Sequence, residues 1–243
     1  MTTSPLFENA VDSLDLAIHF LLHSDRHTAQ KHAVLNSFHA VELLLKERLH
    51  QAHPLLVFEK VGGSVDDDAR TVGVREAYSR LRNAGVELDE QDWKDLRSLQ
   101  KHRNRIEHRH FDPDPAHKLL TRKALNFIFR FVRDHLEEDL SEWLDEQVYA
   151  EAREQVLSHQ QMLEDAKKKL RELGVEGEAE CCPECGEETF IITDDFPNNG
   201  KCTYCLNEYE VESCDSCGRY GPVSVLHEWG MCDDCFEHQV ARF

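Results

Sequence analysis

The sequence predicts a mainly α-helical protein that ends in a small β-containing domain. Two observations predict this fold class. Apolar residues recur three and four positions apart along most of the first 173 residues, which is the spacing of one helix face. Eight of the nine cysteines, and the short strand-like runs, lie in the last quarter of the chain. We therefore expect a helical domain over 1–138, a long helix and acidic linker over 139–180, and a cysteine-rich domain over 181–243.

The helical domain should contain five helices. Ser4 and Pro5 supply a cap and a first-turn proline for a helix that extends to about residue 22. The second helix covers about 29–50, and its apolar stripe is Val34, Phe38, Val41, Leu45 and Leu49. A loop is expected over 61–68, and further helices at about 75–84, 89–110 and, after a cap at Asp114, 115–138.

A long charged helix should connect the two domains, from Ser141 to Leu173. At ~1.5 Å per residue it would be on the order of 45–50 Å long. It ends at Gly174, and an acidic linker follows over 176–180. Its length and charge favour a spacer, or a strut between two chains, rather than a core element.

The cysteines form four C-x-x-C pairs, a spacing typical of metal ligands. Two such pairs complete the tetrahedron of sulfur atoms that zinc requires, so four pairs provide two structural zinc ions. The intervals between the pairs favour tandem zinc ribbons, each formed by successive pairs. The expected ligands are Cys182, Cys185, Cys202 and Cys205 for one ion, and Cys214, Cys217, Cys232 and Cys235 for the other.

Two other interpretations of the cysteines are open. In cross-braced pairing, the first pair would join the third and the second would join the fourth. A disulfide framework is the other alternative, although paired C-x-x-C units in a chain of intracellular character argue against it. His227 or His238 could replace a cysteine, and Cys181 is left over.

The turns of the cysteine-rich domain also have a pattern. Gly186 and Gly218 each follow the second cysteine of a pair, where a positive φ lets backbone amides face the sulfur atoms. Short strands are expected at 189–193, before a turn at 197–200, and at 223–226, before a turn near 229–230.

The net charge of −19 is unevenly distributed. Residues 1–133 carry 20 Lys+Arg against 19 Asp+Glu, whereas residues 134–243 carry 8 against 28. The stretch from Lys94 to His110 holds six basic residues, two acids and three histidines, so a small basic patch lies in the neutral half. The acidic cysteine-rich domain suits a protein partner better than nucleic acid.

The sequence contains no N-terminal signal segment and no apolar run approaching the length of a membrane span. We therefore expect a cytoplasmic protein with no membrane contact. Reduced, metal-bound cysteines fit that compartment.

The helix expected over 89–110 contains candidate functional residues. Arg103 falls on the same face as Leu96, Leu99 and Ile106, so its guanidinium needs a partner. Glu42, within the stripe of the second helix, is the partner we expect. Asn104 and His108 lie four apart and share a neighbouring face.

The run Arg103-Asn104-Arg105-Ile106-Glu107-His108 resembles the signature of the HEPN family, in which an arginine, a polar residue and three variable residues precede a histidine. The stretch 38–46 is similar to the second helix of that family, and the resemblance covers roughly 5–138. It implies an up-and-down helical bundle of four or five helices. Family members modified by a partner nucleotidyltransferase carry a tyrosine where this chain has His110, so the resemblance does not extend to that toxin–antitoxin mode.

The resemblance implies a metal-independent RNA endonuclease of a bacterial defence or toxin system, which leaves 2′,3′-cyclic phosphate ends. His108 would be the general acid or base, Arg103 would stabilise charge on the phosphate, and Asn104 would hold the phosphate or orient His108. Glu42, Glu107 and His110 would support the site. A homodimer would place two such helices at one RNA-binding groove.

A second hypothesis comes from a different functional class. The chain would be a non-catalytic dimeric adaptor, in which Arg103 and His108 bind a nucleotide or are structural, and the zinc ribbons dock a protein partner. An open groove around Arg103 and His108 would favour the enzyme, and burial or separation of these residues would favour the adaptor.

Overall fold

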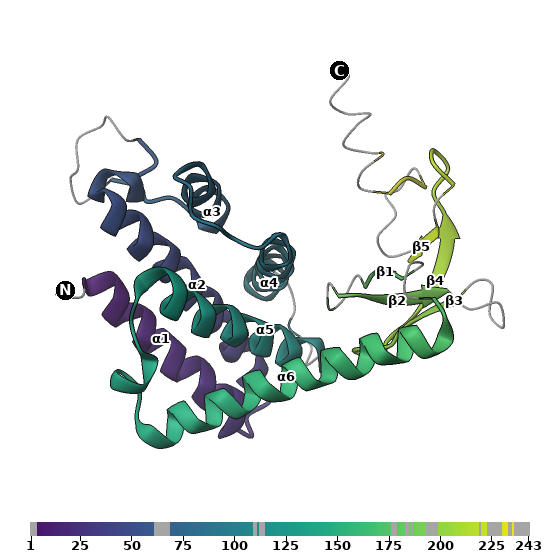
Figure 1. Ribbon diagram of the computed structural model, residues 1–243, viewed down its shortest axis with the longest axis horizontal. Coiled ribbons are helices and arrows are strands. Elements are labelled where there is room, and N and C mark those ends of the chain that lie inside the picture. The colour runs from purple at the N-terminus through teal and green to yellow at the C-terminus, as the bar shows by residue number, and fades with distance from the viewer. Residues whose placement is uncertain are drawn as a thin grey trace. The chain divides into compact units, whose positions relative to one another are not determined.

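The structure is a computed structural model that describes residues 4–60, 69–108, 111, 115–175, 179–182, 185, 187–192, 199–218, 220–222, 230–232 and 235 (Figure 1). The chain forms two compact units, residues 1–159 and residues 160–243, and each is described separately. The first unit is helical. The second contains the end of the longest helix and an antiparallel sheet, so the mainly α class with a small β-containing domain is confirmed.

The first unit begins with α1 (Pro5–Leu22) and α2 (Ala29–Ala52), which lie side by side (Figure 1). The Ser4 side chain accepts a hydrogen bond from the Leu6 N–H at 3.2 Å, so the expected cap is present. Helix α2 is buried around most of its circumference because it packs against α1, α3, α4 and α5.

The other helices of the first unit are α3 (Val74–Asn83), α4 (Glu90–His108) and α5 (Pro115–Phe131), with a 3₁₀ turn η1 (Pro54–Val57) after α2. These bounds agree with the expected helices to within a few residues at most ends. Helix α5 is shorter than expected, because a π turn η2 (Val132–Leu136) follows and ends at Glu137 in the left-handed conformation, φ 57°. The expected loop over 61–68 lies outside the described residues.

The long helix α6 spans Glu146–Leu173 and starts five residues later than expected. The Asp139 carboxylate accepts a hydrogen bond from the Ser141 N–H at 2.9 Å, which closes a separate 3₁₀ turn, η3 (Leu140–Glu142). The Asp145 carboxylate accepts a hydrogen bond from the Gln147 N–H at 2.9 Å, so Asp145, not Ser141, caps α6.

Helix α6 contributes buried side chains to both units, which corrects the expectation of a spacer. Ala152 and Val156 belong to the apolar core of the first unit. Ala166 and Leu170 are buried in the second unit, where the Thr203 hydroxyl donates a hydrogen bond to the Ala166 carbonyl at 3.5 Å. Each half of the helix therefore has a packing role within its own unit.

Among the described residues, the sheet of the second unit has five antiparallel strands in sequential order: β1 (Glu180–Cys181), β2 (Glu188–Ile192), β3 (Asn199–Cys202), β4 (Glu208–Ser213) and β5 (Tyr220–Pro222). Strand β2 confirms the strand expected at 189–193. Residues 199–200 of the expected turn begin β3 instead, and the strand expected at 223–226 lies outside the described residues.

Close packing explains a glycine in this sheet. Gly200 on β3 has no room for a side chain, because a Cβ atom there would lie 2.1 Å from the Cζ atom of the buried Phe190 ring.

In the described part of the chain, no helix has both the length and the apolar character needed to cross a membrane.

Candidate metal centres and the α4 motif

The structure groups the eight paired cysteines into two sets of four. Within each set, the four sulfur atoms all lie within 4.8 Å of one another. The sets join successive pairs, so the sequential arrangement is confirmed and cross-bracing is excluded. They are Cys182, Cys185, Cys202 and Cys205, called here the first cysteine group, and Cys214, Cys217, Cys232 and Cys235, the second cysteine group.

The sulfur–sulfur distances fit a tetrahedral metal site. A tetrahedron with metal–sulfur bonds of 2.3 Å has edges of about 3.8 Å. The Cys182 and Cys205 sulfurs are 3.7 Å apart, and the Cys185 and Cys202 sulfurs are 3.6 Å apart. The Cys217 and Cys232 sulfurs are 3.9 Å apart. All nine cysteines are free thiols in the structure, and these distances are far longer than a disulfide bond, so both groups can hold metal ions.

The first cysteine group lies in a small core. Cys182, Cys185 and Cys202 are buried beside β2 and β3. The Cys202 sulfur lies 3.2 Å from the Thr189 hydroxyl and accepts a hydrogen bond from the Cys205 N–H at 3.3 Å. Hydrogen bonds with the neighbouring thiols, first that of Cys182, lower the pKa of Cys202, whereas contacts with the same thiols raise the pKa of Cys185. A bound cation would displace the protons of these thiols.

The second cysteine group is more exposed. Cys214 is buried, Cys232 and Cys235 are half-buried, and Cys217 is exposed. The Cys214 sulfur accepts a hydrogen bond from the Cys232 N–H at 3.3 Å. Backbone hydrogen bonds, first from Cys232 and then from Cys217, lower the pKa of Cys214 to about 6. These amides would stabilise a metal-bound thiolate in the same way.

The turns around the cysteines explain two glycines. Gly218 has φ +71° and follows Cys217, as expected for a turn that directs amides toward sulfur. Gly230 has φ +66°, and a Cβ atom there would lie 2.4 Å from an Asp215 carboxylate oxygen. Leu206 occupies the position after Cys205 with φ +64°, so an ordinary residue adopts the left-handed conformation in the first group.

Cys181 is not a member of either cysteine group. Cys181 is exposed, and its sulfur lies 4.0 Å from a Glu188 carboxylate oxygen, outside the first cysteine group. His227, His238 and Gly186 lie outside the described residues.

The predicted catalytic side chains lie on the last two turns of α4. Asn104 and His108 are exposed, and the Arg103 side chain is 33% exposed. The Arg103 guanidinium lies over the Phe38 ring, 5.3 Å from its centroid, and donates a hydrogen bond to the Asn104 side-chain oxygen at 3.0 Å. Leu96, Leu99 and Ile106 are buried, which confirms the apolar face beside Arg103.

The expected Arg103–Glu42 ion pair is wrong. Arg103 pairs with Glu107 one turn along its own helix, at 2.8 Å, and Glu42 pairs with Lys46 one turn along α2, at 2.6 Å. Partners four residues apart on one helix are already close, so they form these pairs without a contact across the helix interface. His110 lies outside the described residues.

A cluster of rings beside the motif was not predicted. His102 on α4 is buried, and its ring lies 5.6 Å from that of His117 on α5. The His117 ring stacks on Phe111 at 5.4 Å, and an Arg105 nitrogen lies 2.9 Å from His102 Nδ1. The spacing of His102 from Leu99 and Ile106, three and four residues, is the signal that places it on the buried face.

Comparisons with known proteins provide no relative from which a function can be transferred. No protein-family model matches the chain, and the searches of curated proteins and of solved structures find no match.

Proposed function

We propose that the chain is a metal-independent RNA endonuclease of the HEPN type, whose second unit carries two structural zinc ions. The observation that best supports the proposal is the placement of Arg103, Asn104 and His108 on adjacent turns of α4, with Asn104 and His108 exposed to solvent. Asn104 and His108 share one face of the helix, and the long Arg103 side chain reaches Asn104 with a 3.0 Å hydrogen bond, so a phosphate group bound at Asn104 could contact all three side chains.

His108 would take or give a proton during attack of the ribose 2′-hydroxyl on the adjacent phosphorus. Imidazole suits this role because it exchanges protons near neutral pH. The phosphorus–oxygen bond to the next nucleotide then breaks, which leaves a 2′,3′-cyclic phosphate and a 5′-hydroxyl.

Arg103 would stabilise the negative charge that develops on the phosphate. Its stacking on Phe38 holds the guanidinium at the helix surface, and its hydrogen bond fixes Asn104 beside it. An RNA phosphate would compete with the Glu107 carboxylate for the same guanidinium. Glu107 would thus keep Arg103 in place before the substrate arrives.

One chain provides a single motif histidine, whereas the reaction benefits from one group that accepts a proton and another that donates it. A homodimer through the helical unit would supply the second His108 and would double the basic stretch that begins at Lys94. We further propose that the protein acts in the cytoplasm in a bacterial defence or toxin system, with a protein partner at the acidic second unit.

Zinc is the proposed metal because four thiolates with these sulfur–sulfur distances match its preferred coordination. Its role would be structural, because each group already supplies four ligands and leaves no open coordination position for a substrate. Metal analysis of the purified protein should give two zinc ions per chain.

The decisive experiment incubates the purified full chain with RNA, with and without chelator, and identifies the product ends. We expect cleavage that persists in chelator, and a rate loss of about 10²–10⁴-fold in His108→Ala. His53→Ala, which removes an exposed histidine outside α4, is the matched control and should retain activity. Products with 3′-hydroxyl ends, or full activity in His108→Ala, would exclude this chemistry.

The second candidate function, a dimeric adaptor, is favoured by one observation. Arg103 is already paired with Glu107 and stacked on Phe38, which is also what a structural arginine would do. The adaptor predicts that purified protein leaves RNA intact at every concentration, while it still forms a dimer and captures a partner through its second unit.

A further inference from the structure

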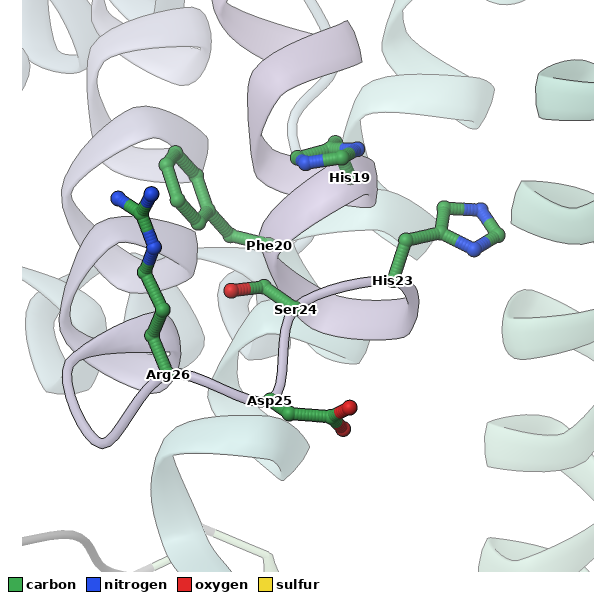
Figure 2. A pocket seen from close by; sticks show the side chains of 6 residues that line it. All are labelled: His19, Phe20, His23, Ser24, Asp25 and Arg26. Atoms are coloured by element: carbon green, nitrogen blue, oxygen red, sulfur yellow. The ribbon is translucent and has the colours of Figure 1, made fainter.

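A cavity lies where α1 turns into α2 and meets the start of α5. Its volume is about 280 Å³, and its walls include Phe20, Arg26, His27, Gln30, His117 and Lys118. A second hollow of about 530 Å³ shares Phe20, Ser24, Asp25 and Arg26 with it and adds His19 and His23 (Figure 2). The smaller cavity, called here the α1–α2 pocket, is separate from the residues of the α4 motif.

Two cations on different segments line the α1–α2 pocket. Arg26 comes from the turn and Lys118 from the first turn of α5, and both are exposed. Neither has an ion-pair partner among the residues that the structure describes, whereas Arg103 and Lys123 are each paired. In a chain of net charge −19, two unpaired cations at one cavity mark a local site for an anion.

The carboxylate in the lining does not cancel this charge. Asp25 is exposed, and Figure 2 shows its carboxylate directed away from the Arg26 guanidinium, which extends toward the same side of the turn as the Phe20 ring. The backbone adds to the attraction. Helix α2 begins at the pocket without an acidic residue in its first turn, and Thr28 at its start makes no side-chain cap.

The pocket also offers a flat surface. The Phe20 ring stacks on His32 with centroids 4.8 Å apart, so its orientation is fixed, and it remains partly exposed. Gln30 and Ser24 add hydrogen-bonding groups to the same lining. A planar ring against Phe20 and an anion at Arg26 and Lys118 together describe one chemical class of ligand.

We propose that the α1–α2 pocket binds a nucleoside 5′-phosphate, with its phosphate between Arg26 and Lys118 and its base against Phe20. A metal ion does not fit as the occupant, because the cysteine groups are the only clusters of metal-ligating side chains found among the described residues. A free mononucleotide and the 5′-phosphorylated end of an RNA strand present the same chemistry, and the experiment distinguishes them.

The pocket is connected to α4 by contacts between rings. His27 at the turn lies 6.2 Å from Phe111, which stacks on His117, and His117 contacts His102. His102 is adjacent in sequence to Arg103. A ligand in the pocket would therefore contact His27 and His117, whose ring contacts lead to His102 on α4, although its binding does not depend on the proposed nuclease activity.

The test is calorimetric titration of the full chain carrying His108→Ala, so that the proposed cleavage cannot consume the ligand. The ligands are a nucleoside 5′-monophosphate, inorganic phosphate, the unphosphorylated nucleoside, and a short RNA with a 5′-phosphate or a 5′-hydroxyl. We expect binding of the monophosphate or of the 5′-phosphorylated RNA, weaker binding of inorganic phosphate, and no binding of the nucleoside.

Substitutions in the lining test whether the ligand binds in the α1–α2 pocket. Arg26→Ala with Lys118→Ala should weaken binding of the phosphorylated ligand by on the order of tenfold or more, because two charge-assisted contacts are lost. Phe20→Leu should weaken binding of the nucleotide and leave binding of inorganic phosphate unchanged. Lys60→Ala with Arg75→Ala removes the same charge from exposed positions outside the pocket and should bind like the parent chain.

The proposal is overturned if neither phosphorylated ligand binds, if the 5′-hydroxyl RNA binds equally well, or if the folded Arg26/Lys118 double variant keeps full affinity. Folding of that variant is checked by its helical circular dichroism. Because every chain in the titration lacks His108, absence of nuclease activity in the wild type would not affect these results.

Discussion

The two units are stabilised by different means. The helical unit has a continuous apolar core in which residues such as Leu45 and Leu49 are fully buried, so its stability comes from side-chain burial. The second unit has short strands and eight paired thiols, and few of the apolar side chains that the structure describes there are as buried as Phe190. A domain with so small a core requires cross-links or metal ions. The comparison indicates that bound metal ions stabilise the second unit, whereas apolar burial stabilises the first.

The two cysteine groups differ in a similar way. Three members of the first group are buried, and the Thr189 hydroxyl lies 3.2 Å from the Cys202 sulfur, whereas the second group has an exposed member, Cys217. We infer that the first group is partly supported by packing and that the second depends more fully on its metal.

Removal of the metal gives the largest expected difference between the units. Structural zinc contributes an apparent binding free energy of about 10–16 kcal/mol in small domains, so a zinc chelator should unfold the second unit and leave the helical unit folded. Limited proteolysis after chelation should yield a stable N-terminal fragment. Loss of helical circular dichroism, in parallel with metal release, beyond the part of α6 that belongs to the second unit would refute independent stabilisation.

Serine substitutions extend this test to the individual groups. Cys217→Ser and Cys202→Ser should each abolish one zinc equivalent. Metal release from the parent chain should show a fast and a slow phase, and Cys217→Ser should remove the fast one, because its group is more accessible to the chelator. A single phase for both ions would show that burial does not distinguish them.

A glycine substitution tests whether packing supports the first group. Gly200→Ala should destabilise the second unit by about 3 kcal/mol, because the added methyl group would overlap the buried Phe190 ring. Gly218→Ala meets no atom within 4 Å but must keep φ +71°, so about 1 kcal/mol is expected from strain alone. Gly73→Ala, at the start of α3 in the first unit, has neither clash nor positive φ and should leave the stability of the second unit unchanged, so it is the control. Equal effects at Gly200 and Gly218, by chemical denaturation, would contradict tight packing.

Acid should affect the helical unit through a buried histidine. Burial, with Lys123, Arg122 and Arg130 nearby, lowers the pKa of His159 to about 4, and the residue is only 3% exposed. The unfolded chain binds this proton near pH 6.5, so stability decreases as the pH falls from about 6.5 to about 4 and levels off below. The loss from this residue is about 3 kcal/mol.

The measurement is thermal unfolding followed by helical circular dichroism across this pH range. His159→Gln should reduce the slope of stability against pH, whereas His19→Gln, at an exposed position, should keep the slope of the parent chain. An unchanged slope in His159→Gln would mean that this histidine does not titrate on unfolding.

Sequence patterns predict the features that depend on local geometry. The cysteine groups follow from C-x-x-C spacing, and Gly218 from the turn it occupies, because a metal site and a tight turn each impose their geometry on a few neighbouring residues. The buried face of α4 follows from periodicity alone.

Ion pairs and helix caps for which several partners compete are harder to predict from the sequence. Arg103 could pair across helices with Glu42 or along its own helix with Glu107, and the outcome depends on side-chain geometry that periodicity does not encode. The start of α6 depends on whether Asp139, Ser141 or Asp145 captures the backbone N–H groups, and all three are good caps. The α1–α2 pocket joins segments about ninety residues apart, so only the fold brings Arg26 and Lys118 together.

The smallest expected effect is a gain in stability at Leu206. This residue follows Cys205 with φ +64°, the position that glycine occupies after Cys217, and it is 60% exposed, so its side chain contributes little packing. A left-handed conformation costs a residue with a Cβ atom about 1 kcal/mol relative to glycine. Leu206→Gly should therefore stabilise the second unit by up to about 1 kcal/mol, reduced by the greater freedom of glycine in the unfolded chain. Asparagine also adopts this φ readily and lacks the extra freedom of glycine in the unfolded chain, so Leu206→Asn should be at least as stable.

Denaturation of the zinc-loaded protein measures the effect, with Leu206→Ala as the control that keeps the strain. A loss of stability in both Gly and Asn variants would mean that the leucine side chain contributes more to the first cysteine group than its exposure indicates.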